Sequence, residues 1–364
     1  MNRKILYRNR FFQLAGFALC LSLMPGFQGC DNQRVEEAIL VIGGAGEGMA
    51  YSNIAMAWVP AENRWYKLAD MPTRRRAMAY SEYDGELYVI GGWSDEPAEE
   101  GDSAGKVALD ILEIYDPMTN TWRRGANMPT KRGKMAHMYP AVDGRIPVAG
   151  GERLGERLSE AAVYYIAEDR WEVLESLPET WTFPYVMANP LQPNLVHFTA
   201  GNTDAQHNQQ DWHTVLDMDT YEWQHNVKAR YPIEITDGDG AVFFRDRWWT
   251  FGGWSHELGS VGDVYAYDFA TDSWEEMPRP PFNSWTHQGA TVIEVDGEER
   301  IYMMGGRTDG ELTDEIWYYD GNQWHQANSR MQVALWNFIC VTKKLNLANL
   351  EPINLDHDAA TELY

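Results

Sequence analysis

The chain has 364 residues, of which 44% are hydrophobic and 13% aromatic, so it carries enough apolar surface for a large folded core. Its formal net charge is −24, from 54 acidic and 30 basic residues. A surface of that sign repels phosphate backbones and anionic lipid headgroups. We therefore expect no nucleic-acid partner, and a membrane contact only through an N-terminal lipid anchor.

The N-terminus has the pattern of a targeting segment. A basic stretch at residues 1–10 precedes an apolar run around residues 14–24 that is too short to span a bilayer. The following Gly29-Cys30 resembles a bacterial lipoprotein signal, in which Cys30 becomes the acylated first residue, although Phe27 and Gln28 depart from the usual pattern. Residues 1–30 are thus predicted to be a signal peptide of the lipoprotein type, which implies export to the cell envelope, facing the periplasm or the cell surface. Plain secretion and an uncleaved anchor are the alternatives.

Apolar runs that end in a Gly-Gly doublet recur along the rest of the chain. The first glycines of five doublets are Gly43, Gly91, Gly150, Gly252 and Gly305, and Gly201-Asn202 is a degenerate sixth, which gives spacings of 48, 59, 51, 51 and 53. Each doublet is followed by an aromatic or apolar residue and then a tryptophan, as in Tyr115 and Trp122 or Tyr267 and Trp274. A period of about 50 residues is typical of a repeat built from one four-stranded sheet.

The segments 115–122 and 267–274 resemble the third strand, turn and fourth strand of the kelch family, and the resemblance covers residues 36–343. It implies an all-β fold, a six-bladed kelch-type β-propeller, in which large aromatic side chains fill the wedges between blades. The repeated glycines and tryptophans are therefore interpreted as structural and are not counted as a binding site.

One further strand, residues 332–343, follows the last repeat without a doublet of its own. It is predicted to be the innermost strand of the first blade, so that the propeller is closed by a C-terminal strand. Residues 31–36 are then a short linker, residues 37–343 the propeller and residues 344–364 a tail. The thiol of Cys340 lies in the apolar part of this strand and is expected to be buried.

The resemblance implies a ligand site at the propeller mouth, where the starts of the first strands and the loops after the doublets meet. Blades two and five share Gly-Gly-Trp-Ser, so Trp93 and Trp254 are expected to flank the opening, where exposed aromatic rings suit stacking on a sugar or a peptide. A solvated rim and recent common ancestry of the two repeats explain the same residues. The candidate site residues are Arg75, Trp93, Asp95, Lys134, Arg153, Tyr185, Asp237, Trp254, His256, His287, Arg307 and Trp336.

Motifs for chemistry are absent from the sequence. His207 and His213 lack the spacing of a zinc site, and Asp237-Gly238-Asp239 lacks the final glutamate of a calcium loop. No metal and no cofactor are expected, although calcium binding by an acidic loop stays open. The acidic insertion at residues 96–105 is expected to form a flap over the mouth, or a solubilising loop.

Two functions follow from these features. The first is a binding protein of the cell envelope that holds a glycan, peptide or protein partner at the mouth. The alternative is a carbohydrate-active enzyme, such as a sugar epimerase, a mutarotase-like enzyme or a lyase, on the same face. The architecture is similar to exported kelch proteins such as N-acetylneuraminate epimerase in repeat number and location, but no catalytic residue carries over.

Overall fold

The computed structural model describes residues 34–95, 106–203, 209–238 and 240–353. These residues form antiparallel β-sheets and two short 3₁₀ turns, Pro60–Glu62 and Leu347–Asn349. None of the described residues belongs to a helix long and apolar enough to cross a membrane. The predicted signal peptide with Cys30, the insertion at 96–105 and residues 354–364 lie outside the described residues.

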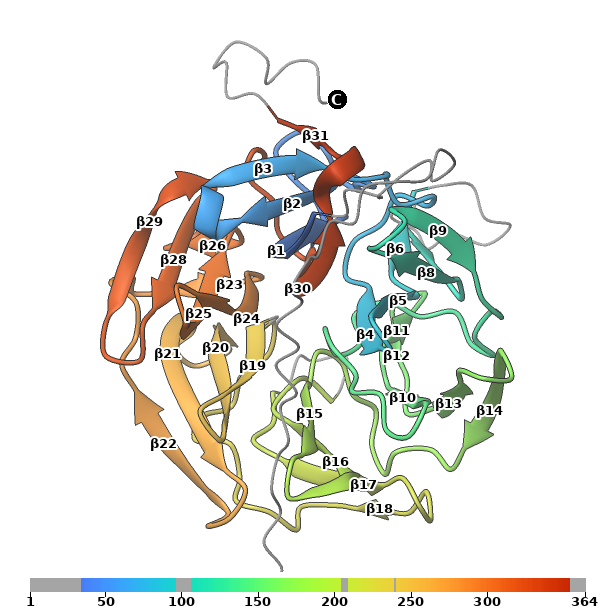
Figure 1. Cartoon of the computed structure of the whole chain (residues 1–364). Helices are drawn as coiled ribbons and strands as arrows, with labels where there is room; N and C mark the ends of the chain where they lie inside the picture. The colour runs from blue at the N-terminus through green and yellow to red at the C-terminus, as the bar shows by residue number, and fades with distance from the viewer. Residues whose placement is uncertain (1–33, 96–105, 204–208, 239, 354–364) are drawn as a thin grey trace, which may run out of the picture. The chain divides into compact units, whose positions relative to one another are not determined.

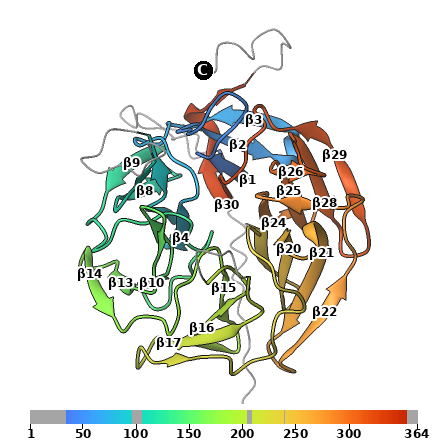
Figure 2. The same cartoon turned by 180° about the vertical axis from the view of Figure 1, so that it is seen from behind.

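Six sheets of three to five strands follow one another around a common centre (Figures 1 and 2). The strands of sheets one to three are, from the inside outwards, β30 (Ile339–Asn346), β1 (Val35–Ile42), β2 (Ala55–Val59), β3 (Arg64–Lys67) and β31 (Glu351–Pro352); β4 (Ala79–Tyr83), β5 (Glu86–Ile90), β8 (Leu112–Asp116) and β9 (Thr121–Arg124); and β10 (Arg145–Ala149), β13 (Ala161–Tyr165) and β14 (Arg170–Leu174).

The strands of sheets four to six are β15 (Tyr185–Asn189), β16 (Gln192–Thr199), β17 (His213–Asp217) and β18 (Trp223–Gln224); β19 (Gly240–Phe244), β20 (Arg247–Ser255), β21 (Gly259–Asp268) and β22 (Ser273–Met277); and β24 (Gly289–Val295), β25 (Glu298–Met304), β28 (Glu315–Tyr319) and β29 (Trp324–Arg330). Short ladders lie in the loops between them, namely β6 (Trp93–Ser94) with β7 (Val107–Ala108), β11 (Glu152–Arg153) with β12 (Glu156–Arg157), and β23 (Trp285–Thr286) with β26 (Arg307–Thr308) and β27 (Glu311–Leu312). The fold is the six-bladed β-propeller that the repeat predicted.

The last long strand pairs with the first, as predicted. β30 is antiparallel to β1 over eight residue pairs, from Ile339 opposite Ile42 to Asn346 opposite Val35. The predicted bounds of 332–343 were shifted, and the chain does not leave the sheet at residue 344. Leu345 and Leu347 are buried, and β31 then pairs with the outer strand β3. These apolar side chains keep residues 344–352 on the first sheet, where the sequence analysis had placed a separate tail.

The third sheet has no regular innermost strand. Residues 132–142 occupy that place, and Pro140 in this segment has no N–H to give to a ladder. The hydroxyl of Tyr139 donates instead to the carbonyl oxygen of Ala149 at 2.7 Å. A side-chain bond thus replaces part of the missing backbone pairing.

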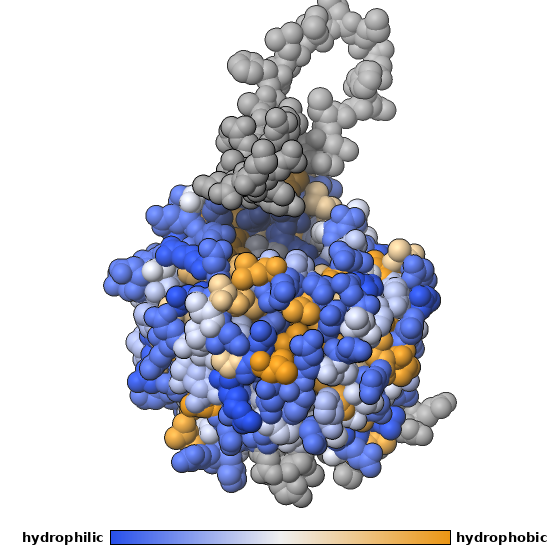
Figure 3. Space-filling view, turned by 90° about the horizontal axis from the view of Figure 1, so that it is seen from below, coloured by the Kyte–Doolittle hydropathy of each residue, from blue (hydrophilic) through white to orange (hydrophobic). Residues whose placement is uncertain are grey.

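The repeated tryptophans join neighbouring blades. The indole N–H of Trp122 donates to the backbone oxygen of Ala69, in the loop that leads in from the preceding blade, at 2.8 Å. The N–H of the same Ala69 donates to Asn120, which also accepts from the hydroxyl of Tyr115. Trp171, Trp223, Trp274 and Trp324 make the equivalent indole bond. The outer surface seen in Figure 3 is mostly hydrophilic, with scattered apolar patches.

The glycine doublets adopt left-handed backbone, and the degenerate doublet of blade four begins one residue earlier than predicted. In five blades both glycines have positive φ, whereas in the fourth the pair is Ala200 (φ 59) and Gly201 (φ 90). Close approach explains the preference for glycine, because a Cβ on Gly150 would lie 2.2 Å from the backbone oxygen of Trp181. Asn202 is therefore the residue after a doublet, the place that Trp93 and Trp254 hold in their blades.

Candidate functional site

The mouth of the propeller is lined by a ring of six residues, one from each blade, which we call the collar. All six have left-handed backbone, with φ between 49° and 56°, at the point where the chain enters or replaces the innermost strand. Five successive backbone bonds link them, from N–H to carbonyl oxygen, at 3.0 to 3.4 Å. The collar consists of Ala77, Lys134, Phe183, Asp237, His287 and Asn337. Strained backbone of this kind persists where the surrounding structure holds it, often at functional sites.

Each blade adds two more residues to the mouth. The residue before the collar residue pairs with the residue after the glycine doublet of the same blade. These pairs are Arg76 with Trp93, Gly133 with Glu152, Thr182 with Asn202, Thr236 with Trp254, Thr286 with Arg307, and Trp336 with Ala45. The backbone of the mouth thus repeats six times, and each blade contributes a different combination of side chains.

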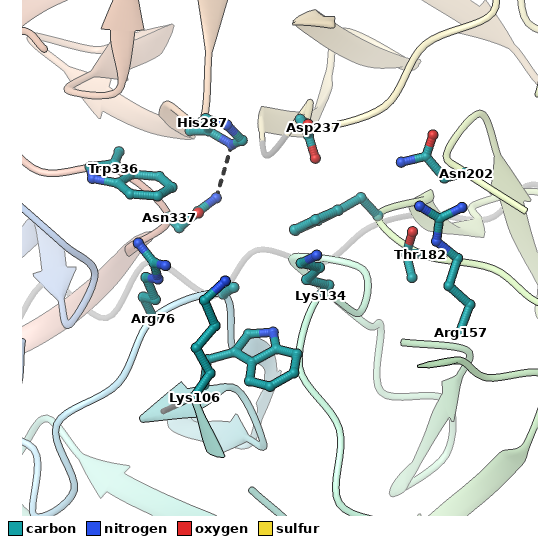
Figure 4. Close-up of a pocket in the computed structure, with 13 residues that line it drawn as sticks. Arg76, Lys106, Lys134, Arg157, Thr182, Asn202, Asp237, His287, Trp336 and Asn337 are labelled. Carbon is teal, nitrogen blue, oxygen red and sulfur yellow. Dashed lines mark hydrogen bonds between the residues drawn. The ribbon is translucent and has the colours of Figure 1, made fainter. Parts of the chain in front are cut away.

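A central cavity of about 180 Å³ lies inside the collar (Figure 4). Its described lining includes all six collar residues, four cationic side chains and a single carboxylate, that of Asp237. The cationic residues are Arg76, Lys106, Lys134 and Arg157. This concentration of positive charge stands out in a chain whose formal net charge is −24.

Arg76 is held by aromatic rings. Its guanidinium carbon lies 4.5 Å from the ring centre of Trp336 and 5.2 Å from that of Tyr51. Burial lowers the pKa of Arg76, partly offset by the nearby Tyr51. No carboxylate of the described residues lies within salt-bridge distance of this guanidinium, whereas the ammonium of Lys134 is 2.8 Å from Glu152.

Other polar groups at the mouth have fixed roles. The Asn337 amide nitrogen lies 3.0 Å from Nδ1 of His287. Because an amide nitrogen only donates, Nδ1 accepts and Nε2 carries the proton of the neutral ring. The indole nitrogen of Trp93 and Oδ1 of Asn202 are buried and have no hydrogen-bond partner among the described residues. The central cavity therefore offers mainly donors and positive charge.

A side cavity of about 640 Å³ opens between blades four, five and six and shares Asn202, Asp237 and His287 with the central one. Its other lining residues are Thr236, Trp254, His256, Ser260, Thr286 and Arg307. The guanidinium carbon of Arg307 lies 5.6 Å from the ring centre of Trp336, the same indole that holds Arg76.

Eight of the twelve candidate residues line one of the two cavities. Trp93, Lys134, Asp237, His287 and Trp336 line the central cavity, and Trp254, His256 and Arg307 join Asp237 and His287 around the side cavity. Arg75, Asp95, Arg153 and Tyr185 line neither.

Two candidate residues, Arg75 and Tyr185, lie two positions from the collar residue of their blade. Arg75 precedes Ala77 by two positions and is fully buried, where it pairs with Glu113 at 2.6 Å and donates to the backbone oxygen of Gly91. Tyr185 follows Phe183 by two positions, and its hydroxyl lies 3.1 Å from the backbone oxygen of Gly252 in the next blade. Both side chains join parts of the scaffold and cannot act as mouth ligands.

Asp95 and Arg153 lie on the loops outside the cavities. The Asp95 carboxylate is exposed and pairs with Arg74 at 2.9 Å. Arg153 follows Glu152, the residue that actually occupies the position after the doublet. Sequence reasoning missed Arg76, Lys106, Arg157, Thr182, Phe183, Asn202 and Asn337. Arg76 is adjacent to the candidate Arg75, and Asn202 is adjacent to Gly201, so a correct alignment of the repeats would have identified both. Lys106 occupies no repeated position, and nothing in the sequence points to it.

The expected pair of exposed tryptophans is not formed. Trp93 is only 2% exposed and packs in a small apolar cluster with Tyr51, Ala77 and Ala108. Trp254 is half-buried and lines the side cavity, which Trp93 does not reach. Among the described residues, no three His, Cys, Asp or Glu side chains are grouped so that they could hold a metal ion.

Known proteins that are similar to this chain contain the kelch repeat. A family profile described as the Kelch motif matches residues 74–129 and 240–281, which are blades two and five. Kelch-like protein 36 of Bos taurus is 23% identical over 334 residues, covering 85% of this chain and 49% of the relative. Kelch-like protein 35 of Mus musculus is 25% identical over 313 residues, covering 84% and 48%. Kelch-like ECH-associated protein 1B of Danio rerio is 33% identical over 95 residues, covering 26% and 15%. The chain spans about half the length of Kelch-like proteins 35 and 36.

Proposed function

Since this chain belongs to the kelch-repeat family, we propose that it is a binding protein whose mouth holds an acidic segment of a protein partner. The observation that carries the proposal is the Arg76 guanidinium, fixed over Trp336 and Tyr51 with no described carboxylate beside it. The printed name of one relative, an ECH-associated protein, records association with another molecule.

The charge distribution supports an anionic ligand of limited size. A partly buried cation without an ion pair has lost hydration, and a ligand carboxylate would restore a strong charge-assisted bond. Lys106, Lys134 and Arg157 add to the positive potential in the same cavity, and among the described residues Asp237 is the one acidic residue that lines it. The strongly acidic chain as a whole repels extended polyanions, so a short acidic segment fits better than nucleic acid.

The test is fluorescence anisotropy with labelled hexaglutamate and labelled hexalysine as probes. Hexaglutamate should bind more tightly, and Arg76→Gln should weaken its binding by roughly tenfold or more, because truncating one partner of a buried charge pair is costly. Arg153→Gln is the matched control, since it removes an arginine of a mouth loop that lines neither cavity. Equal binding by the wild type and Arg76→Gln, or no preference for hexaglutamate, would reject the proposal.

The glycan ligand and the carbohydrate-active enzyme remain the alternative hypothesis for this face. We also propose export and lipid attachment at Cys30, supported only by the pattern of residues 1–30, which lie outside the described part of the chain. Fatty-acid labelling that is lost in Cys30→Ser supports attachment, and labelling that persists in this variant contradicts it.

A further inference from the structure

The side cavity differs in chemistry from the central one. Among the described residues that line it there is no lysine, and the charged side chains are Arg307 and Asp237, with the imidazoles of His256 and His287 beside them. Hydroxyl groups of Thr236, Thr286 and Ser260 complete the lining together with Asn202 and Trp254. Asp237 stands where the two cavities meet and disfavours a second acidic group there.

Trp254 gives this cavity a flat apolar wall. Its indole is half-buried, and the exposed ring of His256 stands nearly perpendicular to it, with 6.0 Å between the ring centres and 72° between the planes. A ligand ring that stacks its face on the indole of Trp254 would present its edge to the imidazole of His256. A planar ring therefore suits this wall better than a branched aliphatic group.

Asn202 supplies a hydrogen-bond requirement. Its amide nitrogen donates to Oγ1 of Thr236 at 2.9 Å, while its Oδ1 is buried and has no partner among the described residues. The residue is only 4% exposed, and Figure 4 shows its amide directed toward the interior of the mouth. An unsatisfied buried acceptor is destabilising, and a ligand that brings one O–H or N–H donor relieves it.

We propose that the side cavity binds a tyrosine side chain of the partner segment. The phenol ring stacks on Trp254, its hydroxyl donates to Oδ1 of Asn202, and its oxygen accepts from Arg307. A sugar would bring several hydroxyl groups, whereas Asn202 presents only one buried acceptor without a partner. This inference rests on the proposed function in one respect, that the mouth is the binding face, and it adds a tyrosine next to the acidic group.

The test uses neutral probes, so that it does not depend on the anion site. N-acetyl-tyrosinamide, N-acetyl-phenylalaninamide and methyl β-glucoside are titrated into the full chain and followed by the indole N–H signals in NMR. Wild type should bind the tyrosine probe roughly tenfold more tightly than the phenylalanine probe, as a site that pairs with a ligand hydroxyl does. Trp254→Ala should abolish this binding.

Two Asn202 variants distinguish the proposed hydrogen bond to the tyrosine hydroxyl from the shape of the cavity. Asn202→Leu removes the acceptor and should bring the tyrosine probe down to the level of the phenylalanine probe, whereas Asn202→Asp keeps an acceptor and should keep the preference. Arg153→Gln, which removes an arginine of a mouth loop that lines neither cavity, should leave both affinities unchanged. Equal affinity for the two aromatic probes, or binding of the glucoside alone, overturns the tyrosine assignment without touching the acidic-segment proposal.

Discussion

Blades two and five carry the same Gly-Gly-Trp-Ser sequence and place its tryptophan in different surroundings. Trp93 is 2% exposed and packs under the mouth, while Trp254 is half-buried and lines the side cavity. The difference comes from the neighbouring blade. Gly133 of blade three has no side chain, and a Cβ there would lie 2.4 Å from the indole of Trp93. Blade six presents Thr286 at the same repeat position, beside Trp254 in the cavity lining. Burial of a mouth residue is therefore set by the next repeat along the ring.

Truncation of the two indoles should give the largest contrast. Trp93→Ala should cost about 3 to 5 kcal/mol of unfolding free energy, as large-to-small changes in a packed core do. Trp254→Ala should cost less than about 1.5 kcal/mol, because its ring is partly exposed and faces a cavity. Urea denaturation of both variants measures the difference, and equal losses would show that the two sites are equally structural.

Acid should destabilise the packing between blades four and five. His197 and His213 of blade four lie buried against Tyr267 and Phe269 of blade five, with 2.8 Å between Nδ1 of His197 and Nε2 of His213. Burial lowers the pKa of His197 to about 3 and that of His213 to about 4. The unfolded chain therefore takes up these protons first, and stability is lost as pH falls below about 6.5 toward these values.

For each proton that the unfolded chain binds and the folded chain does not, the free energy of unfolding falls by about 1.4 kcal/mol per pH unit in that window. Unfolding free energies measured between pH 7 and pH 4 should therefore fall less steeply for His197→Gln combined with His213→Gln than for the wild type. Because both proteins share all carboxylates, the difference between the two curves isolates the histidine pair. Parallel curves would contradict the assignment.

A substitution at Gly133 tests why Trp93 is buried and Trp254 is not. Gly133→Ala adds a methyl group against Trp93 and should cost about 1 to 3 kcal/mol through overpacking, while the indole moves toward solvent. Tryptophan fluorescence should shift to longer wavelength. In the Trp93→Ala background the same substitution should cost much less, since the clash is gone. An equal cost in both backgrounds would mean that Gly133 is required for its backbone alone.

The sequence predicted the architecture from features that repeat locally. The doublets, the Tyr-to-Trp segments and the extra strand before residue 343 indicated six sheets and the pairing of β30 with β1. It misplaced the fourth doublet by one residue, because Ala200 adopts the left-handed backbone that is usually left to glycine. It also ended the fold too early, since burial of Leu345 and Leu347 shows only when the first sheet is assembled.

The mouth could be predicted only in part. Lys134, Asp237 and His287 coincide with collar positions, whereas Arg75 and Tyr185 lie two residues from the collar. The collar residue precedes the first residue of its doublet by 14 to 18 positions in blades two to six, so no fixed offset from the doublet locates it in the sequence. Arg75 lies two residues before Ala77, and Tyr185 two residues after Phe183, and both side chains are buried. Arg75 pairs with Glu113, donates to the backbone oxygen of Gly91 and so becomes part of the scaffold.

The sequence by itself determined the number of blades, the tryptophan contacts between them and the return of the chain to its first strand, because each depends on a pattern within one repeat or between adjacent repeats. Only the tertiary structure decided which side chains line the two cavities of the mouth. At the collar, six sheets converge, and the exposure of one residue depends on the size of its neighbour in the next blade. Gly133 buries Trp93, and the ring of Trp336 fixes Arg76 in the cavity, although neither partner lies in the same blade.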